Sequence, residues 1–236
     1  MAVSFNLEEA QICAVLSSMV YDTKQGEGRS WDQLNRILRE NADRYPTISH
    51  ILKNLQVRQD ESSFDMACFS SSSTIYIAVR GTDITNVRDV LNDVLIFNTG
   101  AAGRRSNTCV ENALQWKKSH AGKRVVCTGH SLGGTVALAL MRSKVGDFAH
   151  VFNYGRGITN VVGGAIMAIL SAIFGDADFA HQALHHHIFG DGLSPRYTAM
   201  VPVITYKGNC QSGNPTTAHG INNFTDAVAR GGWPTV

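Results

Sequence analysis

The sequence has no block of basic residues and almost no net charge. Its 236 residues include 21 Lys and Arg and 19 Asp and Glu, which gives a formal net charge of +2 at pH 7. Nucleic-acid-binding domains gather positive charge on one face, so no nucleic-acid partner is expected. The composition, 44% hydrophobic and 17% charged, is that of a globular protein. The length suits a single α/β domain over residues 1–236.

The cysteines do not form a recognisable redox or metal-binding pattern. There are five of them, an odd number, and none stands in a C-x-x-C spacing; they are Cys13, Cys68, Cys109, Cys127 and Cys210. Cys68 and Cys127 fall in predicted strands, where a free thiol behaves as a small apolar residue. We interpret all five as reduced thiols.

The sequence also lacks a secretion signal and a run long enough to cross a membrane. Residues 1–9 contain no basic region and no long apolar core, so no signal peptide is expected. The longest apolar run, residues 161–174, has fourteen residues, whereas a bilayer core requires about 20. A soluble, intracellular protein is expected, with secretion by another route left open.

Strands and helices alternate after a helical N-terminal segment, residues 1–60. The apolar spacing predicts helices over 5–21, 31–40, 46–55, 109–120, 135–144 and 222–230, strands over 64–69, 74–79, 123–128, 149–153, 184–189 and 201–206, and a polar loop over 98–107. Such alternation implies parallel strands, right-handed crossovers and helices on both faces of the sheet. The sequence therefore predicts an α/β fold with a mostly parallel sheet, whose function collects at the carboxyl ends of the strands.

The central motif is a Gly-x-Ser-x-Gly turn between a strand and a helix, which is the context of a nucleophile elbow. Gly129 and Gly133 remove side-chain bulk on either side of Ser131, while His130 is held within the turn itself. Ser131 is thus a candidate nucleophile at a helix N-terminus, where negative charge is favoured. The alternative is a glycine-rich turn that only packs tightly or binds a phosphate.

A serine nucleophile needs an imidazole base oriented by a carboxylate, and in α/β-hydrolases the acid and then the histidine follow the serine. Asp191 follows the predicted strand 184–189; it is the candidate acid, although aspartate is also common in plain turns. Asp176 and Asp178 are rivals within an insertion. His219 is the only histidine after Asp191; it is the candidate base, the alternative being a surface loop histidine.

Two further features bear on chemistry. An oxyanion hole requires N–H donors, and the backbone N–H of Leu132 and that of Thr82, at the end of the strand 75–79, are the candidates.

His181 and the run 185–187 allow a metal cluster to be considered. That tract passes from an apparent helix into a strand without Cys or Glu at matching spacing, so we expect neither a metal nor a cofactor.

Six short blocks, in order, resemble the class 3 lipases, the fungal lipase family. They are Ile77–Thr82, Asn92–Phe97, Gly129–Gly134, Phe152–Gly157, Ile188–Asp191 and Ala218–Phe224. The resemblance implies an α/β-hydrolase fold with Ser131 as nucleophile, Asp191 as orienting acid, His219 as general base, and Thr82 with Leu132 as oxyanion donors. It implies hydrolysis of carboxylic esters, of acylglycerols or phospholipids, through an acyl-enzyme. Two alternatives are an inactive relative that binds lipid or protein, and an acyltransferase or thioesterase with the same triad.

The segment 158–183 is an apolar insertion before the candidate acid. It could be a lid or acyl-chain wall that transiently contacts a lipid surface, or a buried crossover helix, which also explains its all-round apolar pattern. We favour the buried helix. The sequence gives no indication of the oligomeric state.

Overall fold

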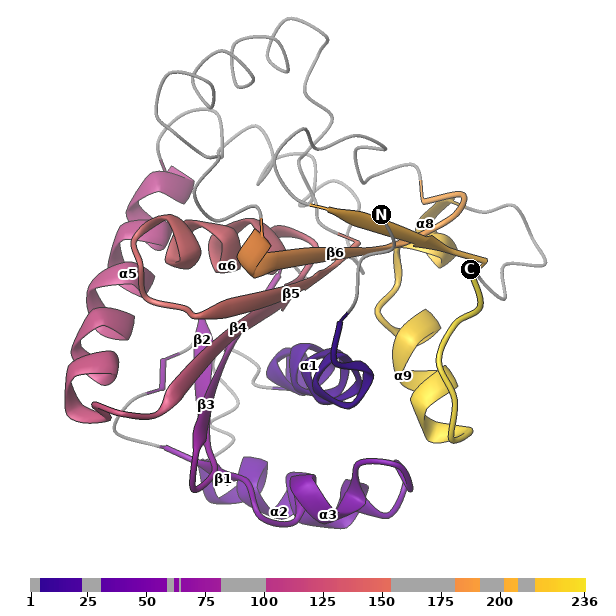
Figure 1. Cartoon of the computed structure of the whole chain (residues 1–236), viewed down its shortest axis with the longest axis horizontal. Helices are drawn as coiled ribbons and strands as arrows, with labels where there is room; N and C mark the ends of the chain where they lie inside the picture. Colours follow the sequence, from indigo (N-terminus) through magenta and orange to yellow (C-terminus); the bar gives the residue numbers. More distant parts are fainter. Residues whose placement is uncertain are drawn as a thin grey trace, which may run out of the picture.

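The computed structural model describes residues 5–22, 31–58, 62–63, 65–81, 101–153, 181–191, 202–207 and 215–236 (Figure 1). The strands are β1 (Gln56–Val57), β2 (Met66–Ser70), β3 (Thr74–Val79), β4 (Arg124–His130), β5 (Phe148–Phe152), β6 (Ala183–Ile188) and β7 (Val203–Tyr206). The helices are α1 (Leu7–Met19), the 3₁₀ turn η1 (Val20–Asp22), α2 (Trp31–Ala42), α3 (Ser49–Leu52), α5 (Ala101–Ser119), α6 (Leu132–Arg142), α8 (Pro215–His219) and α9 (Asn222–Ala229).

The described strands form one sheet whose spatial order is the order of the chain, from β1 to β7. The pairs β1–β2 and β2–β3 are antiparallel, and every later pair is parallel. Right-handed crossovers that always step in the same direction put their helices on the same face of the sheet. Accordingly α5 and α6 cover one face, while α1 and α9 cover the other (Figure 1). This confirms the predicted mostly parallel α/β sheet with helices on both faces.

Alternation along the strands divides the core into two layers. In β3, Ile75, Ile77 and Val79 pack into the cluster beneath α5 and α6, whereas Tyr76 and Ala78 pack into the cluster beneath α1. Successive side chains of a strand point to opposite faces. A strand buried on both sides therefore reads as a continuous apolar run, which is how it was recognised in the sequence.

Helix α1 is buried on nearly every side because it lies between the sheet and α9. Its first turn is capped by the Asn6 side chain, which accepts the backbone N–H of Glu9 at 3.2 Å. In a capping box the side chain at the position of Glu9 would bind back to the capping residue. The Glu9 carboxylate instead binds Arg124 and His150, which lie on β4 and β5. The acidic residue thus ties the helix to the sheet.

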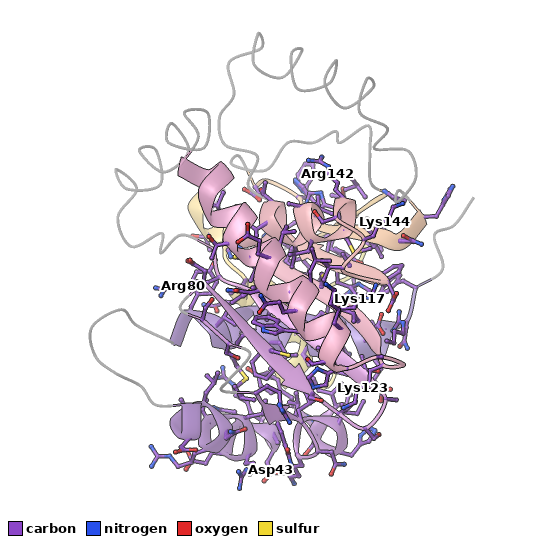
Figure 2. All side chains as sticks on the ribbon, turned by 90° about the vertical axis from the view of Figure 1, so that its left-hand side faces the viewer. Asp43, Arg80, Lys117, Lys123, Arg142 and Lys144 are labelled. Carbon is purple, nitrogen blue, oxygen red and sulfur yellow. The ribbon has the colours of Figure 1, made fainter. Side chains whose placement is uncertain are left out.

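The two ends of the sheet are distinguished by the charged residues around them. Lys123 and Lys144 precede β4 and β5, and they lie on the opposite side of the molecule from Arg80, which follows β3 (Figure 2). Lys123 donates to the Ser70 hydroxyl at 2.9 Å, so it pins the β2–β3 turn rather than standing free. Arg80 is buried and marks the carboxyl end, where the candidate site was expected.

Several local predictions were wrong. Helix α5 begins at Ala101, inside the predicted loop 98–107; alanine and arginine favour helix, and the one glycine costs only about 1 kcal/mol. The third helix is the single turn α3 rather than 46–55. Two short elements, the edge strand β1 and helix α8, were not predicted. They are too short to show a periodicity.

Other predictions concern thiols, membranes and the insertion. Cys13, Cys68, Cys109 and Cys127 are buried free thiols, and Cys210 lies outside the described residues. Among the helices described above, none combines the length and the apolar character that a membrane crossing demands. Of the insertion, residues 158–180 also lie outside the described part, so the choice between a lid and a buried helix stays a prediction.

Candidate active site

Ser131 occupies a sharp turn between β4 and α6. Its backbone has φ 56° and ψ −127°, a conformation that is strained for a residue with a side chain. The Ser131 N–H donates to the Phe152 carbonyl at 3.1 Å, and its own carbonyl accepts the N–H of Gly134 at 3.0 Å. A Cβ on Gly129 would overlap the backbone of Gly133. The strand and the helix therefore approach each other too closely for any other residue, as expected for an elbow.

The three predicted side chains meet at the carboxyl end of the sheet. The Nε2 atom of His219 lies 2.8 Å from the Ser131 hydroxyl oxygen, and its Nδ1 atom lies 2.9 and 3.1 Å from the two oxygens of Asp191. Ser131 is 6% exposed, His219 1% and Asp191 2%, so bulk water does not separate the three side chains. A carboxylate accepts hydrogen bonds, which places the proton of a neutral His219 on Nδ1 and directs the Nε2 lone pair to the hydroxyl.

The three residues come from elements that are far apart in the chain. Ser131 stands between β4 and α6, His219 is the last residue of α8, and Asp191 follows β6. Gly190, with φ 91°, makes the turn after β6, and the Asp191 N–H donates to the Ile188 carbonyl at 3.1 Å. Asp191 is therefore a turn residue whose carboxylate also contacts the imidazole. His219 was expected in a loop, but it ends a short helix. The rivals Asp176 and Asp178 lie outside the described residues.

The expected oxyanion donors are only partly within the described chain. Leu132 is the first residue of α6, so its N–H has no carbonyl one turn earlier in the helix to which it could donate. Thr82 lies outside the described residues, and its role stays a prediction. The described chain does reach Gly81. A Cβ on Gly133 would come within 2.9 Å of the Gly81 nitrogen, so the segment that leads to Thr82 starts beside the first turn of α6.

Buried polar side chains next to the site hold the main chain of His219. The His130 Nε2 atom lies 2.6 Å from the His219 carbonyl oxygen, and the Asn153 amide nitrogen lies 2.9 Å from the same oxygen. The Tyr21 hydroxyl is 3.0 Å from His130 Nδ1. Sequence reasoning did not find Tyr21 or Asn153 and assigned His130 only to the elbow. The one signal for Asn153 was a polar residue directly after a buried strand.

Burial determines the charge of the histidines near the site. Burial, reinforced by the neighbouring His219, lowers the pKa of His130 to about 3, although its bond to the His219 carbonyl and Asp191 oppose the shift. His130 is therefore neutral, donates from Nε2, and accepts the Tyr21 hydroxyl at Nδ1. Burial likewise lowers the pKa of His185 to about 3, with a further contribution from His187.

A separate buried polar chain crosses the face of the sheet beneath α1. From the surface inward it runs through Arg124, Glu9, His150, His186 and Tyr206, with His150 to His186 and His186 to Tyr206 distances of 2.9 Å each. Burial raises the pKa of Glu9, but hydrogen bonds from His150 and Arg124 outweigh it and the net pKa is lowered. Glu9 is thus an ionised acceptor between Arg124 and His150.

The histidine tract considered for a metal is divided among different surroundings. His186 belongs to the polar chain, while His181 is exposed on the segment before β6. Over the residues that the structure describes, no three His, Cys, Asp or Glu side chains gather as a metal site would require.

The comparisons with known proteins concern the fold. No family model and no curated protein matches the sequence. A solved triacylglycerol lipase, whose catalytic centre is a serine protease triad, aligns with a TM-score of 0.51 and 17% identity, over 88% of this chain and 80% of that chain. A deletion mutant of the Rhizomucor miehei lipase propeptide complex aligns with a TM-score of 0.49 and 15% identity, over 87% and 69%. The first alignment shows that the fold is similar to that of a triacylglycerol lipase, in agreement with the predicted α/β-hydrolase-like fold.

Proposed function

We propose that this chain with a lipase-like fold is a serine hydrolase that cleaves carboxylic esters, of acylglycerols or phospholipids, through an acyl-enzyme. The observation that carries the proposal is the 2.8 Å separation between the Ser131 hydroxyl and His219 Nε2, with Asp191 on the other ring nitrogen. A serine hydroxyl is a weak nucleophile until a positioned base removes its proton. A module that only binds lipid or protein has no need of this arrangement.

The proposed reaction has two halves. The Ser131 oxygen attacks the ester carbonyl carbon while His219 takes the hydroxyl proton, and Asp191 stabilises the imidazolium that forms. The tetrahedral adduct carries its negative charge on the former carbonyl oxygen. The N–H of Leu132 and the assigned donor Thr82 bind that oxygen, each worth about 3 kcal/mol. His219 then protonates the departing alcohol, and a water molecule releases the acid by the same steps.

A lipid substrate is supported by two observations. The fold neighbour is a triacylglycerol lipase. Phe189, two residues before Asp191 in the chain, is 68% exposed, so its ring is available to contact an acyl chain or a lipid surface. No cofactor enters this chemistry, because the nucleophile, base and oxyanion donors all come from the chain.

A fluorophosphonate probe tests the proposal directly. The folded protein should be labelled at Ser131, and Ser131→Ala should abolish labelling. Ser143→Ala is the matched control, because Ser143 stands at the other end of α6 and should leave labelling unchanged. His219→Ala should lower turnover of a p-nitrophenyl ester by roughly 10⁴- to 10⁶-fold. Folded parent protein that is neither labelled nor active would overturn the proposal in favour of a binding module.

The acyl preference follows from a second measurement. A series of p-nitrophenyl esters of increasing chain length, with and without micelles, should show turnover that rises with chain length and increases at the interface. A preference for the shortest esters, with no effect of micelles, would instead indicate a soluble esterase.

A further inference from the structure

The carbonyl oxygen of His219 accepts hydrogen bonds from two buried side chains. Asn153 Nδ2 lies 2.9 Å away and His130 Nε2 lies 2.6 Å away, and both donors are at most 2% exposed. A carbonyl oxygen has two lone pairs, so its capacity is used completely. The main chain of the candidate base is therefore held from two sides, independently of the contacts that its imidazole makes.

Asn153 joins three elements through one amide group. Its Nδ2 atom donates to the carbonyls of Ala218 at 3.0 Å and His219 at 2.9 Å, and its Oδ1 atom accepts the N–H of Ile188 at 2.9 Å. Rotating the amide by 180° would set its oxygen against two carbonyl oxygens and its NH₂ against an N–H. The orientation is thus determined by its partners. Its φ of 39° suits asparagine, which tolerates the left-handed region better than most residues.

The elements that Asn153 joins carry the other two members of the site. Ile188 ends β6, and its carbonyl accepts the N–H of Asp191, so Asn153 and Asp191 both bind the same peptide segment. Ala218 and His219 end α8. We propose that Asn153 is a positioning residue that sets the separation between the Asp191 carboxylate and the His219 imidazole. This inference rests on the proposed esterase function.

The physical need for such a residue follows from the length of α8. The helix has five residues, Pro215–His219, too few to be stable without external contacts. The last carbonyls of a helix have no partner within it. Here the Asn153 side chain donates to two of them, beside His130 at the His219 carbonyl and Asn223 at the Ala218 carbonyl, and so forms part of a C-terminal cap. Loss of the amide that holds both carbonyls would loosen the last turn, and a displacement of about 1 Å at the imidazole can cost about 100-fold in rate.

Two substitutions separate the amide from the backbone conformation. Asn153→Asp keeps the size and the tolerance of positive φ but removes the NH₂ donor. Asn153→Gly keeps the backbone and removes the whole amide. Both should lower kcat for a short soluble ester by about 100-fold and leave KM within about twofold, because the substrate does not touch Asn153. Should Asn153→Asp fail to fold, Asn153→Gly provides the same test.

Asn223, on α9, offers a matched control because its amide also contacts carbonyls of α8. Its amide donates to the carbonyls of Thr217 at 2.8 Å, Ala218 at 3.2 Å and Gly220 at 2.9 Å, which flank His219 in the chain, whereas Asn153 donates to the His219 carbonyl itself. Asn223→Ala should therefore lower the thermal midpoint and leave kcat within about threefold. An equal loss of kcat in Asn223→Ala and the Asn153 variants would mean that α8 needs only general support, and would overturn the inference.

The pH dependence supplies a readout that a merely structural role would not move. In Asn153→Asp the new carboxyl faces two carbonyl oxygens, and it can donate a hydrogen bond only when protonated. The ratio of its kcat to that of the parent should rise as the pH falls from 8.5 to 6.5, whereas the ratio for Asn153→Gly should stay constant. Parental kcat in both variants, with a parent that the fluorophosphonate probe labels, overturns this inference alone. An unlabelled, inactive parent overturns the proposed function instead.

Discussion

Lowering the pH from 7.5 to 5.5 should remove about 4 kcal/mol from the free energy of unfolding. Burial lowers the pKa of His130 and of His185 to about 3, and places the pKa of His186 well below its ordinary value. In the unfolded chain each titrates near 6.5. Above that pH both states are neutral and the histidines have no effect. Below pH 6.5 the unfolded chain binds protons at these histidines that the native chain does not bind, so the free energy of unfolding falls as the pH falls.

The magnitude follows from linkage. At pH 5.5, one unit below the unfolded pKa, each histidine costs about 1.4 kcal/mol, which for three gives about 4 kcal/mol. Domains of this kind are stable by about 5–15 kcal/mol in total, so the loss is a large share. Glu9 acts in a lower window: its pKa is lowered in the fold, so its contribution is present at neutral pH and is lost only as the pH falls below that of an ordinary carboxyl.

Urea unfolding followed by far-UV circular dichroism at pH 7.5, 6.5 and 5.5 measures this dependence. His130→Gln removes one titrating group while keeping a donor near the His219 carbonyl, and should reduce the loss from about 4 to about 2.7 kcal/mol. A free energy of unfolding that changes by less than about 1 kcal/mol between pH 7.5 and 5.5 would refute the reasoning. It would mean that these imidazoles are open to water or can be protonated in the native state.

Two further perturbations test the elbow and the ion pair under α1. Gly129→Ala should abolish fluorophosphonate labelling and lower the melting temperature, because a Cβ there overlaps the backbone of Gly133. Gly232→Ala is the control: a Cβ at Gly232 meets only an ordinary 3.7 Å contact, so labelling and melting temperature should not change. Arg124→Met should cost about 1–3 kcal/mol in urea unfolding by leaving the buried Glu9 without its cation; an unchanged unfolding midpoint would show that this pair contributes nothing.

The strands and the elbow could be predicted because their signals are local. A strand buried on both faces reads as an apolar run, which residues 75–79 supply in β3 and residues 125–127 supply in β4. The elbow needs small residues at two fixed positions, which Gly129 and Gly133 provide. In each case the physical requirement acts on consecutive residues. Chain order alone was then enough to nominate Asp191 and His219, which the structure brings to hydrogen-bonding distance of each other.

The rest could not be predicted because it depends on contacts between distant segments. Helix α8 has no periodicity of its own and exists through its caps, among them Asn153, which is 65 residues away from Ala218 in the chain. Tyr21 approaches His130 only because η1 packs against the end of β4. Glu9 looks like a capping residue from its spacing, and only the folded chain shows that it binds Arg124. Apart from the position of Asn153 beside a buried strand, nothing in their local sequence distinguishes these polar residues from surface ones.

The topology explains why the candidate base depends on the ends of the described chain. Because the crossover helices occupy one face, the other must be covered by α1 and by the C-terminal helix α9, which follows α8 in the chain. His219 therefore reaches Ser131 from a segment that is anchored on α1, where the Gln11 side chain donates to the Gly232 carbonyl at 3.0 Å. Loosening the α1–α9 contact would release the imidazole without touching the nucleophile. In this fold the packing of those helices is thus a condition for the proposed chemistry.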